Sequence, residues 1–199
     1  MKLYHGSPVE SFKPQFGLGN DEHDYGRGFY TTPYVELGRE WAVGHQEGDE
    51  MNGHPYDEIY LTQVIETQGK FFEELQDIEP PIDSQKTIED YMRSNLRRQL
   101  DEGHAFFLTM DAANLRKRLF QEPGKAPRPG EPLRGFLPNW IGRFYGYCQW
   151  YWNVSSEQVV EKLPVADMTS LYRGAHDLDL AVAVRKIGAP LFGDEPKPV

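Results

Sequence analysis

The chain has 199 residues, of which 39% are hydrophobic and 26% charged, and its formal net charge is −10. A chain of this length can bury a core without disulfides, and its composition is that of an ordinary globular protein. The acidic balance disfavours nucleic acid as a substrate or partner, because phosphate binding relies on a basic face. The basic residues Arg97 and Arg98, and the cluster Arg116–Arg118, are predicted to lie on solvated helix faces.

Two further features of the sequence bear on the compartment in which the protein resides. No apolar run approaches the ~20 residues of a membrane-spanning helix, and the first residues, MKLYHGS, lack the apolar core of a signal peptide. The single cysteine, Cys148, excludes an internal disulfide and is predicted to be a small buried residue rather than a nucleophile. We therefore expect a cytoplasmic protein with no membrane contact.

The N-terminal part begins with a predicted strand and a glycine-rich stretch. Lys2–His5 is the first strand, which Gly6–Pro8 ends. In Asp24–Ala42 two glycines flank an aromatic strand, and Thr32 and Pro33 then suit the first turn of a helix. This stretch predicts a strand that leads directly into a short helix.

Beyond residue 57 the pattern predicts strands on both sides of a helical stretch. Helices are expected at 85–102, capped by Ser84 and stopped by Gly103, and after the cap residue Asp111. Strands are expected at 58–66, 104–110, 140–153, 155–163 and 178–187. Residues 121–138 hold five prolines and three glycines and are predicted to be a loop.

This order of elements predicts a single α+β domain over residues 1–199. Strands dominate both ends without regular βαβ alternation, which favours a mostly antiparallel sheet. In this interpretation residues 80–120 form a helical insertion beside the sheet, and 121–138 a proline- and glycine-rich loop.

Two motifs near the N-terminus follow one another in order. His5-Gly6-Ser7 ends the first strand, and about twenty residues later comes Gly26-x-Gly28-x-Tyr30-x-Thr32, with Trp41 on the next helix. Glycines let another molecule approach the backbone, and aromatic rings offer faces for stacking. The pair resembles the NAD-binding half of the ADP-ribosyltransferase superfamily, in its diphtheria-toxin and poly(ADP-ribose) polymerase branch. Residues 2–42 are more closely similar to a bacterial ADP-ribosyltransferase-like family, domain of unknown function 3990.

The resemblance implies an ADP-ribosyltransferase-like split antiparallel β-sheet with flanking helices and NAD in the cleft between its halves. His5 would bind the adenosine ribose, and the Gly6 backbone would pair with the nicotinamide amide. Tyr30 would stack on the nicotinamide ring, and Trp41 would replace the second stacking aromatic, for which the family more often has tyrosine. The NAD site would comprise His5, Gly6, Ser7, Gly28, Tyr30, Thr31 and Trp41.

The third catalytic group would stabilise the oxocarbenium-like transition state of NAD cleavage. The superfamily usually has Glu on a late strand and the closer family often shows Gln, so Glu157 and Gln158 are both candidates. Because adjacent strand residues point to opposite faces, only one of them could reach the site. Asp177 and Asp179, on the later predicted strand, are rivals.

The resemblance implies mono-ADP-ribosyl transfer from NAD to a macromolecule, by a bacterial toxin or effector that could be delivered into a target cell's cytoplasm. A protein is the expected acceptor, nucleic acid is less favoured, and an antitoxin or immunity protein would be a further partner. One alternative is an NAD glycohydrolase. Another is a catalytically inert module that binds NAD or ADP-ribose, or that mediates protein contacts.

Other interpretations of the same residues stay open. His5 alone could be a structural histidine, and Tyr30 and Trp41 could be core aromatics. His45, Asp49, Glu50 and His54 lie close together in a polar loop, but scattered ligand types in such a loop are usually solvated, and we predict no metal site.

Overall fold

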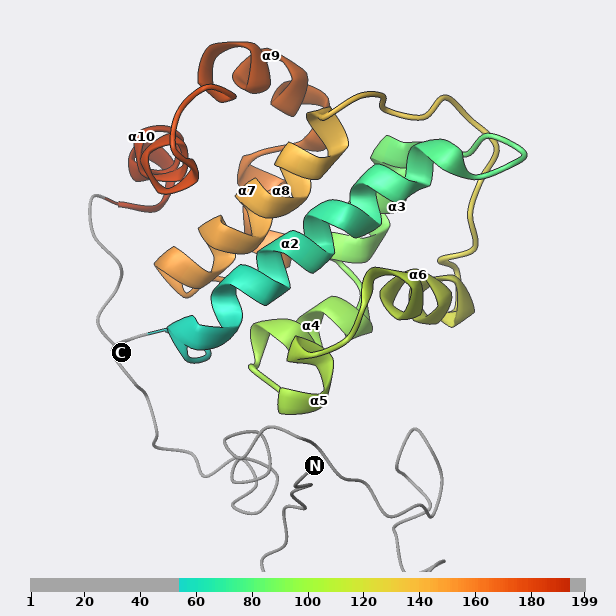
Figure 1. Ribbon diagram of the computed structural model, residues 1–199, viewed down its shortest axis with the longest axis horizontal. Helices are drawn as coiled ribbons and strands as arrows, with labels where there is room; N and C mark the ends of the chain where they lie inside the picture. The colour runs from blue at the N-terminus through green and yellow to red at the C-terminus, as the bar shows by residue number, and fades with distance from the viewer. Residues whose placement is uncertain (1–53, 194–199) are drawn as a thin grey trace, which may run out of the picture. The chain divides into compact units, whose positions relative to one another are not determined.

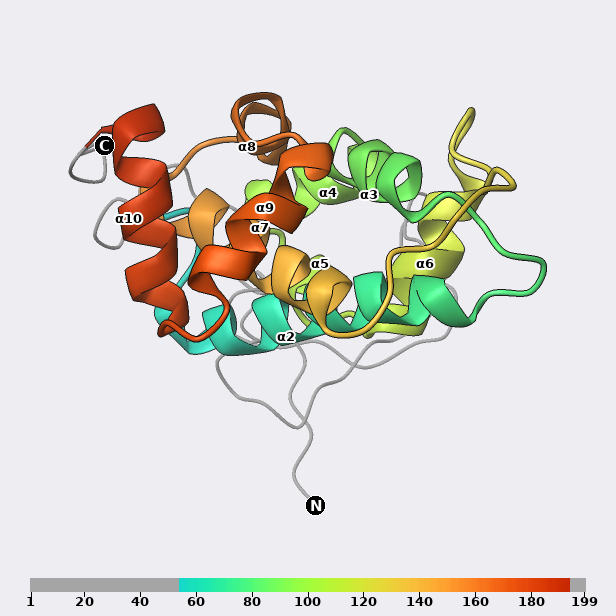
Figure 2. The same cartoon turned by 90° about the horizontal axis from the view of Figure 1, so that it is seen from above.

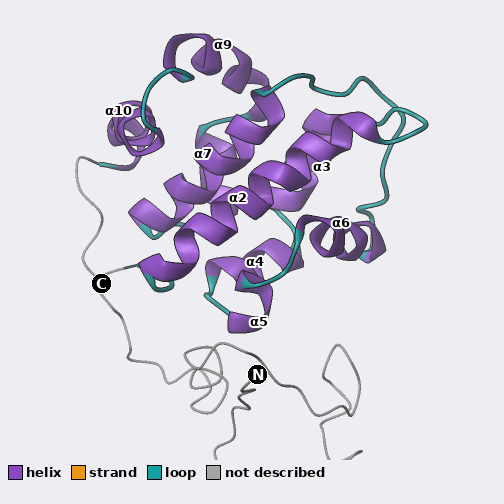
Figure 3. Cartoon of the chain, in the orientation of Figure 1, coloured by secondary structure: helices purple, strands orange, loops and turns teal. Residues whose placement is uncertain are grey.

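The computed structural model describes residues 54–193, all of which belong to the compact unit Glu50–Val199 (Figure 1). This part of the chain contains helices and no strand (Figure 3). The elements are α2 (Glu58–Glu74), the 3₁₀ turn η1 (Leu75–Asp77), α3 (Ser84–Met92), α4 (Asn95–Asp101), α5 (Ala105–Leu108), α6 (Ala112–Gln121), α7 (Leu137–Trp152), α8 (Ser156–Lys162), α9 (Val165–Ala175) and α10 (Leu180–Phe192). The predicted α+β fold with a split antiparallel sheet is therefore wrong for residues 54–193.

The strands that were expected beyond residue 57 are replaced by helices. The ranges 58–66, 104–110, 140–153, 155–163 and 178–187 correspond to α2, α5, α7, α8 and α10. In α7 the buried residues Trp140, Phe144, Cys148 and Trp152 recur at every fourth position. Aromatic residues favour strands only weakly, so the helical period of the buried side chains prevails.

The helices predicted at 85–102 and after Asp111 are confirmed in position, with one break in the first. The helix at 85–102 is divided into α3 and α4, because the Ser94 Oγ accepts a hydrogen bond from Arg97 N at 2.9 Å and so caps a second helix. Asp83 caps α3 in place of the predicted Ser84. Gly103 follows α4 with a φ of 69°, the left-handed conformation that ends many helices.

The cap predicted at Asp111 is also confirmed, and the loop predicted at 121–138 is confirmed for residues 122–136. The Asn114 backbone N–H donates to Asp111 Oδ1 at 2.8 Å at the start of α6. Between α6 and α7, residues 122–136 contain no helix and make a single isolated bridge, from Pro129 to Ile82. The predicted elements Lys2–His5 and Asp24–Ala42 lie outside the described residues.

Helices α2 and α7 run antiparallel and in direct backbone contact through the middle of the unit (Figures 1 and 2). A Cβ atom placed on Gly142 would lie 2.7 Å from the Gly69 Cα. The Gln68 side chain is buried at this contact and donates from Nε2 to the Gly142 carbonyl at 2.8 Å. Only glycine at these positions lets the two helix axes approach so closely.

The remaining helices pack around this pair. Figure 2 shows α2 on one side and α3, α4 and α8 on the other, with α7 between them. Helix α10 packs against α7, where a Cβ atom on Gly188 would collide with the Trp152 ring at 2.2 Å. The core is continuous and rich in aromatic residues; Phe71, Phe72 and Tyr91 pack edge to face in it.

We expect Gly142→Ala to destabilise the unit by about 1–3 kcal/mol, because the added methyl group overlaps the α2 backbone. Gly174→Ala is the matched control, since a Cβ atom there meets nothing within 4 Å and alanine favours the helix. Urea unfolding followed by circular dichroism measures both changes. Equal stability of the Gly142→Ala protein and the wild type would contradict the direct backbone contact between α2 and α7.

Candidate functional site

A fully buried arginine lies at the centre of a polar cluster that joins α4, α7 and α8. The Arg97 side chain has no exposed surface. Its Nε donates to Ser156 Oγ at 2.6 Å, and its Nη2 donates to Gln149 Oε1 at 3.2 Å. Asp101, one turn later, supplies the counter-charge, with Oδ1 3.4 Å from Arg97 Nη2. The guanidinium therefore links three helices through one charged group.

Asp101 is itself held by the start of α8. Its Oδ2 accepts from the Ser156 backbone N–H and its Oδ1 from the Ser156 hydroxyl, each at 2.7 Å. Burial raises the pKa of Asp101, and the Arg97 charge and the bonds from Ser156 oppose that shift. Hydrogen bonds with Ser156 and Gln149 replace part of the water that Arg97 and Asp101 lose on burial.

Two tyrosine hydroxyls lie beside the guanidinium. Tyr56 Oη, Tyr91 Oη and Arg97 Nη1 are all buried, and none has a partner in hydrogen-bond geometry in the described part of the chain. Burial raises the pKa of Tyr91 to about 12 and raises that of Tyr56 as well. Both hydroxyls therefore keep their protons at neutral pH.

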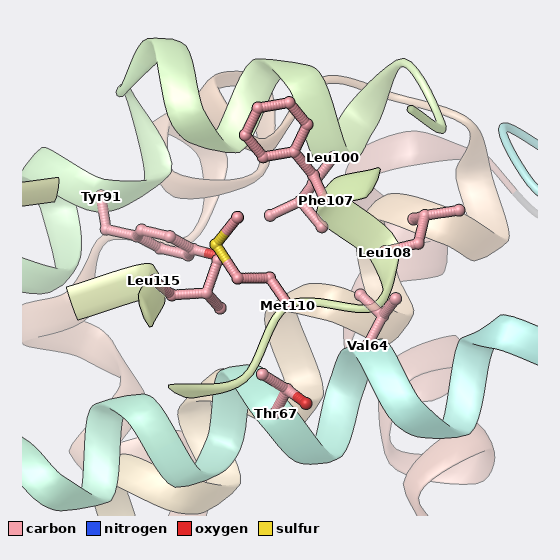
Figure 4. Close-up of a pocket in the computed structure, with 8 residues that line it drawn as sticks. All are labelled: Val64, Thr67, Tyr91, Leu100, Phe107, Leu108, Met110 and Leu115. Atoms are coloured by element: carbon pink, nitrogen blue, oxygen red, sulfur yellow. The ribbon is translucent and has the colours of Figure 1, made fainter. Parts of the chain in front are cut away.

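A small apolar cavity adjoins the cluster (Figure 4). It is too narrow to admit a water molecule and is lined by Val64, Thr67, Tyr91, Leu100, Phe107, Leu108, Met110 and Leu115. Figure 4 shows the Tyr91 hydroxyl directed toward Met110 and Leu115. The lining has no carboxylate, imidazole or amine to orient a polar substrate, so this cavity is not a candidate active site.

The segment before α2 is anchored on α7. The His54 ring stacks on Trp150, with centroids 3.7 Å apart and planes 13° apart, and its Nδ1 donates to the Trp150 carbonyl at 3.0 Å. The Trp150 Nε1 in turn donates to the Tyr56 carbonyl at 2.9 Å. His54, considered above as a scattered metal ligand, is thus engaged with an indole.

The two leading candidates for the third catalytic group lie in the first turn of α8 and are both exposed. Gln158 completes a capping box: its Oε1 accepts from the Ser155 N–H at 3.0 Å, and its own N–H donates to Ser155 Oγ at 3.1 Å. Glu157 lies in the same turn, where a negative charge favours the helix dipole. The two residues were expected to point to opposite faces of a strand. That prediction is wrong, because both lie on a helix.

The rival carboxylates also lie outside any strand. Asp179 caps α10, with Oδ1 accepting from the Ala181 N–H at 3.0 Å, and Asp177 lies 3.2 Å from the His176 Nε2. The other predicted site residues lie outside the described residues: His5, Gly6, Ser7, Gly28, Tyr30, Thr31 and Trp41. The structure therefore brings none of the described candidates together in a pocket.

The sequence interpretation missed Arg97, which was expected on a solvated helix face. One signal in the sequence could have indicated its burial. Arg97 and Asp101 are four residues apart, and each directly follows a leucine, Leu96 and Leu100. Cys148 is confirmed as a buried residue, and burial raises its thiol pKa far above the ordinary range. That thiol is therefore no nucleophile at neutral pH.

Residues 54–193 contain neither a cluster of metal ligands nor a helix that could span a membrane. No group of three or more His, Cys, Asp or Glu side chains in this range could hold a metal ion. Within the same range, every helix is too short or too polar to cross a membrane.

Comparison with known proteins gives one match. Residues 1–77 match the family model described as "Protein of unknown function (DUF3990)", which supports the resemblance of residues 2–42 to that family. The matched range includes α2 and η1 and ends where η1 ends. No curated protein and no solved structure matches the chain.

We expect Arg97→Met to destabilise the protein by about 3–5 kcal/mol, because Asp101 would remain buried without its counter-charge. The adjacent Arg98→Met is the control: Arg98 is exposed, its Nε lies 3.9 Å from Glu102, and its loss should change stability by less than about 1 kcal/mol. Urea unfolding compares the two variants. Similar small effects would contradict the central role of the buried pair.

The raised pKa of Tyr91 predicts a loss of stability in alkali. The unfolded tyrosine loses its proton near its ordinary pKa of 10.0 and the folded one near 12, so stability is complete below the first value and falls as pH rises through the second. The fall should be about 1.4 kcal/mol per pH unit for this group. The Tyr91→Phe protein lacks this group, so its free energy of unfolding should fall by about 1.4 kcal/mol less per pH unit than that of the wild type between pH 10 and 12. Urea unfolding measures both proteins, and an equal pH dependence would contradict the raised pKa of Tyr91.

Proposed function

We propose that the protein cleaves NAD and transfers ADP-ribose to a protein acceptor. The observation that carries the proposal is the ordered pair of motifs, His5-Gly6-Ser7 and Gly26-x-Gly28-x-Tyr30, inside the range that matches the family model. Either motif alone would be weak, but their order and spacing together favour an NAD site of the ADP-ribosyltransferase type.

The resemblance to the ADP-ribosyltransferase superfamily assigns a role to each group. Tyr30 and Trp41 hold nicotinamide between rings, while His5 and Gly6 fix the ribose and the amide. The bond between nicotinamide and ribose breaks, nicotinamide leaves with the bonding electrons, and a nucleophilic side chain of the acceptor bonds to the ribose carbon and releases its proton. Positive charge develops on the ribose during this step, so a carboxylate nearby lowers the barrier.

Glu157 is the better of the two α8 candidates for that carboxylate. It is exposed and carries a charge that can accept hydrogen bonds from ribose hydroxyls. Gln158 is neutral and its amide oxygen already accepts from the Ser155 N–H. Using Gln158 in catalysis would break the capping box, which typically contributes about 1 kcal/mol to a helix.

A second candidate function is binding of NAD or ADP-ribose without turnover. It is favoured by the helical structure of residues 54–193, which have no strand on which a third catalytic residue could lie as in the superfamily. NAD hydrolysis, without an acceptor, would use the same groups as transfer. The toxin or effector setting, the cytoplasmic location and an antitoxin or immunity partner belong to the proposal on the strength of the resemblance.

Nicotinamide release from NAD by the full chain tests the proposal. We expect release by the wild type, a loss of about 100-fold or more in Tyr30→Ala, and near-normal release in the matched variant Tyr30→Phe, which keeps the stacking ring. Glu157→Gln should reduce release if Glu157 is the carboxylate, whereas loss confined to Gln158→Ala would transfer that role.

Calorimetry with NAD separates the alternatives. Binding without release, even with candidate acceptor proteins present, would support the inert module. Release without label transfer from NAD to protein would indicate hydrolysis. Neither binding nor release would refute every NAD-based function.

A further inference from the structure

Residues 54–57 lead into α2 beside the last turns of α7, and we call them the entry strap (Figure 1). The His54 ring stacks on Trp150 of α7, and the Trp150 Nε1 donates to the Tyr56 carbonyl at 2.9 Å. The strap also packs against the turn after α4, where a Cβ atom on Gly103 would lie 2.3 Å from the Pro55 carbonyl oxygen. It is therefore held by two separate elements of the helical unit.

Each end of the strap has a different environment. The Tyr56 ring is buried, and Asp57 caps α2 by accepting from the Ile59 N–H at 3.0 Å. His54 is half-buried at the start of the strap. Among the side chains of the strap, only the imidazole is of a type that ordinarily gains a proton between pH 8 and 5. His54 is thus the point at which a change of pH can act on the strap.

The contact with α7 identifies which nitrogen of His54 takes up that proton. Nδ1 lies 3.0 Å from the Trp150 carbonyl oxygen, which can only accept, so Nδ1 carries the proton of the neutral ring. Nε2 makes no hydrogen bond within the described part of the chain. Protonation of Nε2 therefore leaves the existing hydrogen bond in place and adds a positive charge to the ring.

The added charge strengthens both contacts between His54 and Trp150. The ring centroids are 3.7 Å apart and the planes 13° apart, so a cationic imidazole lies over the face of the indole, the aromatic ring that attracts cations best. The bond from Nδ1 to the carbonyl becomes charge-assisted and roughly twice as strong. Loss of water opposes the charge, but the ring is only half-buried and keeps part of its hydration.

The charges around the strap act in the same direction. The titratable and charged side chains on the elements that surround it are Asp57 and Glu58 at the start of α2, Arg97, Asp101, Glu102 and His104 in α4 and the turn after it, and Tyr147 on α7. Arg97 pairs with Asp101, and His104 lies 3.2 Å from Glu102. Burial raises the pKa of Tyr147, which stays neutral. The remaining charges, on Asp57 and Glu58, are negative and attract a cation.

We propose that His54 and Trp150 form a pH-sensitive clamp, which holds the entry strap more firmly as pH falls from 8 to 5.5. The range that matches the family model, residues 1–77, continues through the strap into α2, so the clamp acts within that range. This inference does not depend on NAD chemistry.

Hydrogen exchange of the Trp150 indole N–H in the full chain tests the proposal. This N–H is protected by its bond to the Tyr56 carbonyl and exchanges when the strap opens. Nuclear magnetic resonance gives the protection factor relative to free indole at the same pH. Protection in the wild type should be about fivefold greater at pH 5.5 than at pH 8. The His54→Phe protein keeps a stacking ring but gains no proton, so its protection should be equal at the two pH values.

Two other histidines supply controls. His176 also bonds through Nδ1 to a backbone carbonyl, that of Tyr172 at 3.0 Å, and its ring lies against the Tyr172 ring, so His176→Phe is the matched substitution at a distant site. His104→Gln removes the histidine in the neighbouring turn. Both variants should keep the wild-type rise in protection, and circular dichroism establishes that each is folded.

Three outcomes would overturn the clamp. The first is equal protection of the wild-type indole N–H at the two pH values. The second is a rise in the His54→Phe protein as large as that of the wild type. The third is loss of the rise in His104→Gln, which would assign the titration to His104.

Discussion

The close contact between α2 and α7 is the constraint on which the rest of the helical unit depends. Gly69 and Gly142 let two backbones meet, and Gln68 then closes the gap by donating to the Gly142 carbonyl. Because α7 also contacts α8, α9 and α10, its position against α2 sets where those helices can lie. A larger side chain at this contact would displace an entire layer of the core, not one residue.

The second constraint is polar. Arg97 bonds to α7 and α8 from within α4, and Asp101 balances its charge. An interior ion pair adds little net stability over well-packed apolar residues, but it tolerates only one geometry, since each unmet bond is strongly unfavourable in a low dielectric. We infer that this cluster selects the arrangement of the three helices, while the apolar core supplies most of the free energy.

Local signals in the sequence predicted some elements and failed for others. Asp111 and Gly103 mark helix ends through hydrogen bonds and backbone freedom that act within a few residues, and both were predicted. The aromatic run of α7 was assigned to strands because propensity was given more weight than period, although Trp140, Phe144, Cys148 and Trp152 follow a helical spacing. The Ser155–Gln158 capping box, visible as S-x-x-Q, was read as part of a strand that carried a catalytic residue.

The sequence by itself determined the order of the N-terminal motifs, the helix ends at Asp111 and Gly103, and the proline-rich loop, because each depends on neighbours in the chain. Only the tertiary structure decided that Arg97 is buried, that Gly142 touches Gly69, and that Gly130 lies against Asp83. Those facts depend on residues far apart in the chain, and no local pattern specifies which partner a side chain will meet. Arg97 is the centre of a buried polar network because its guanidinium bonds to Ser156 and Gln149, which are more than fifty residues away in the chain.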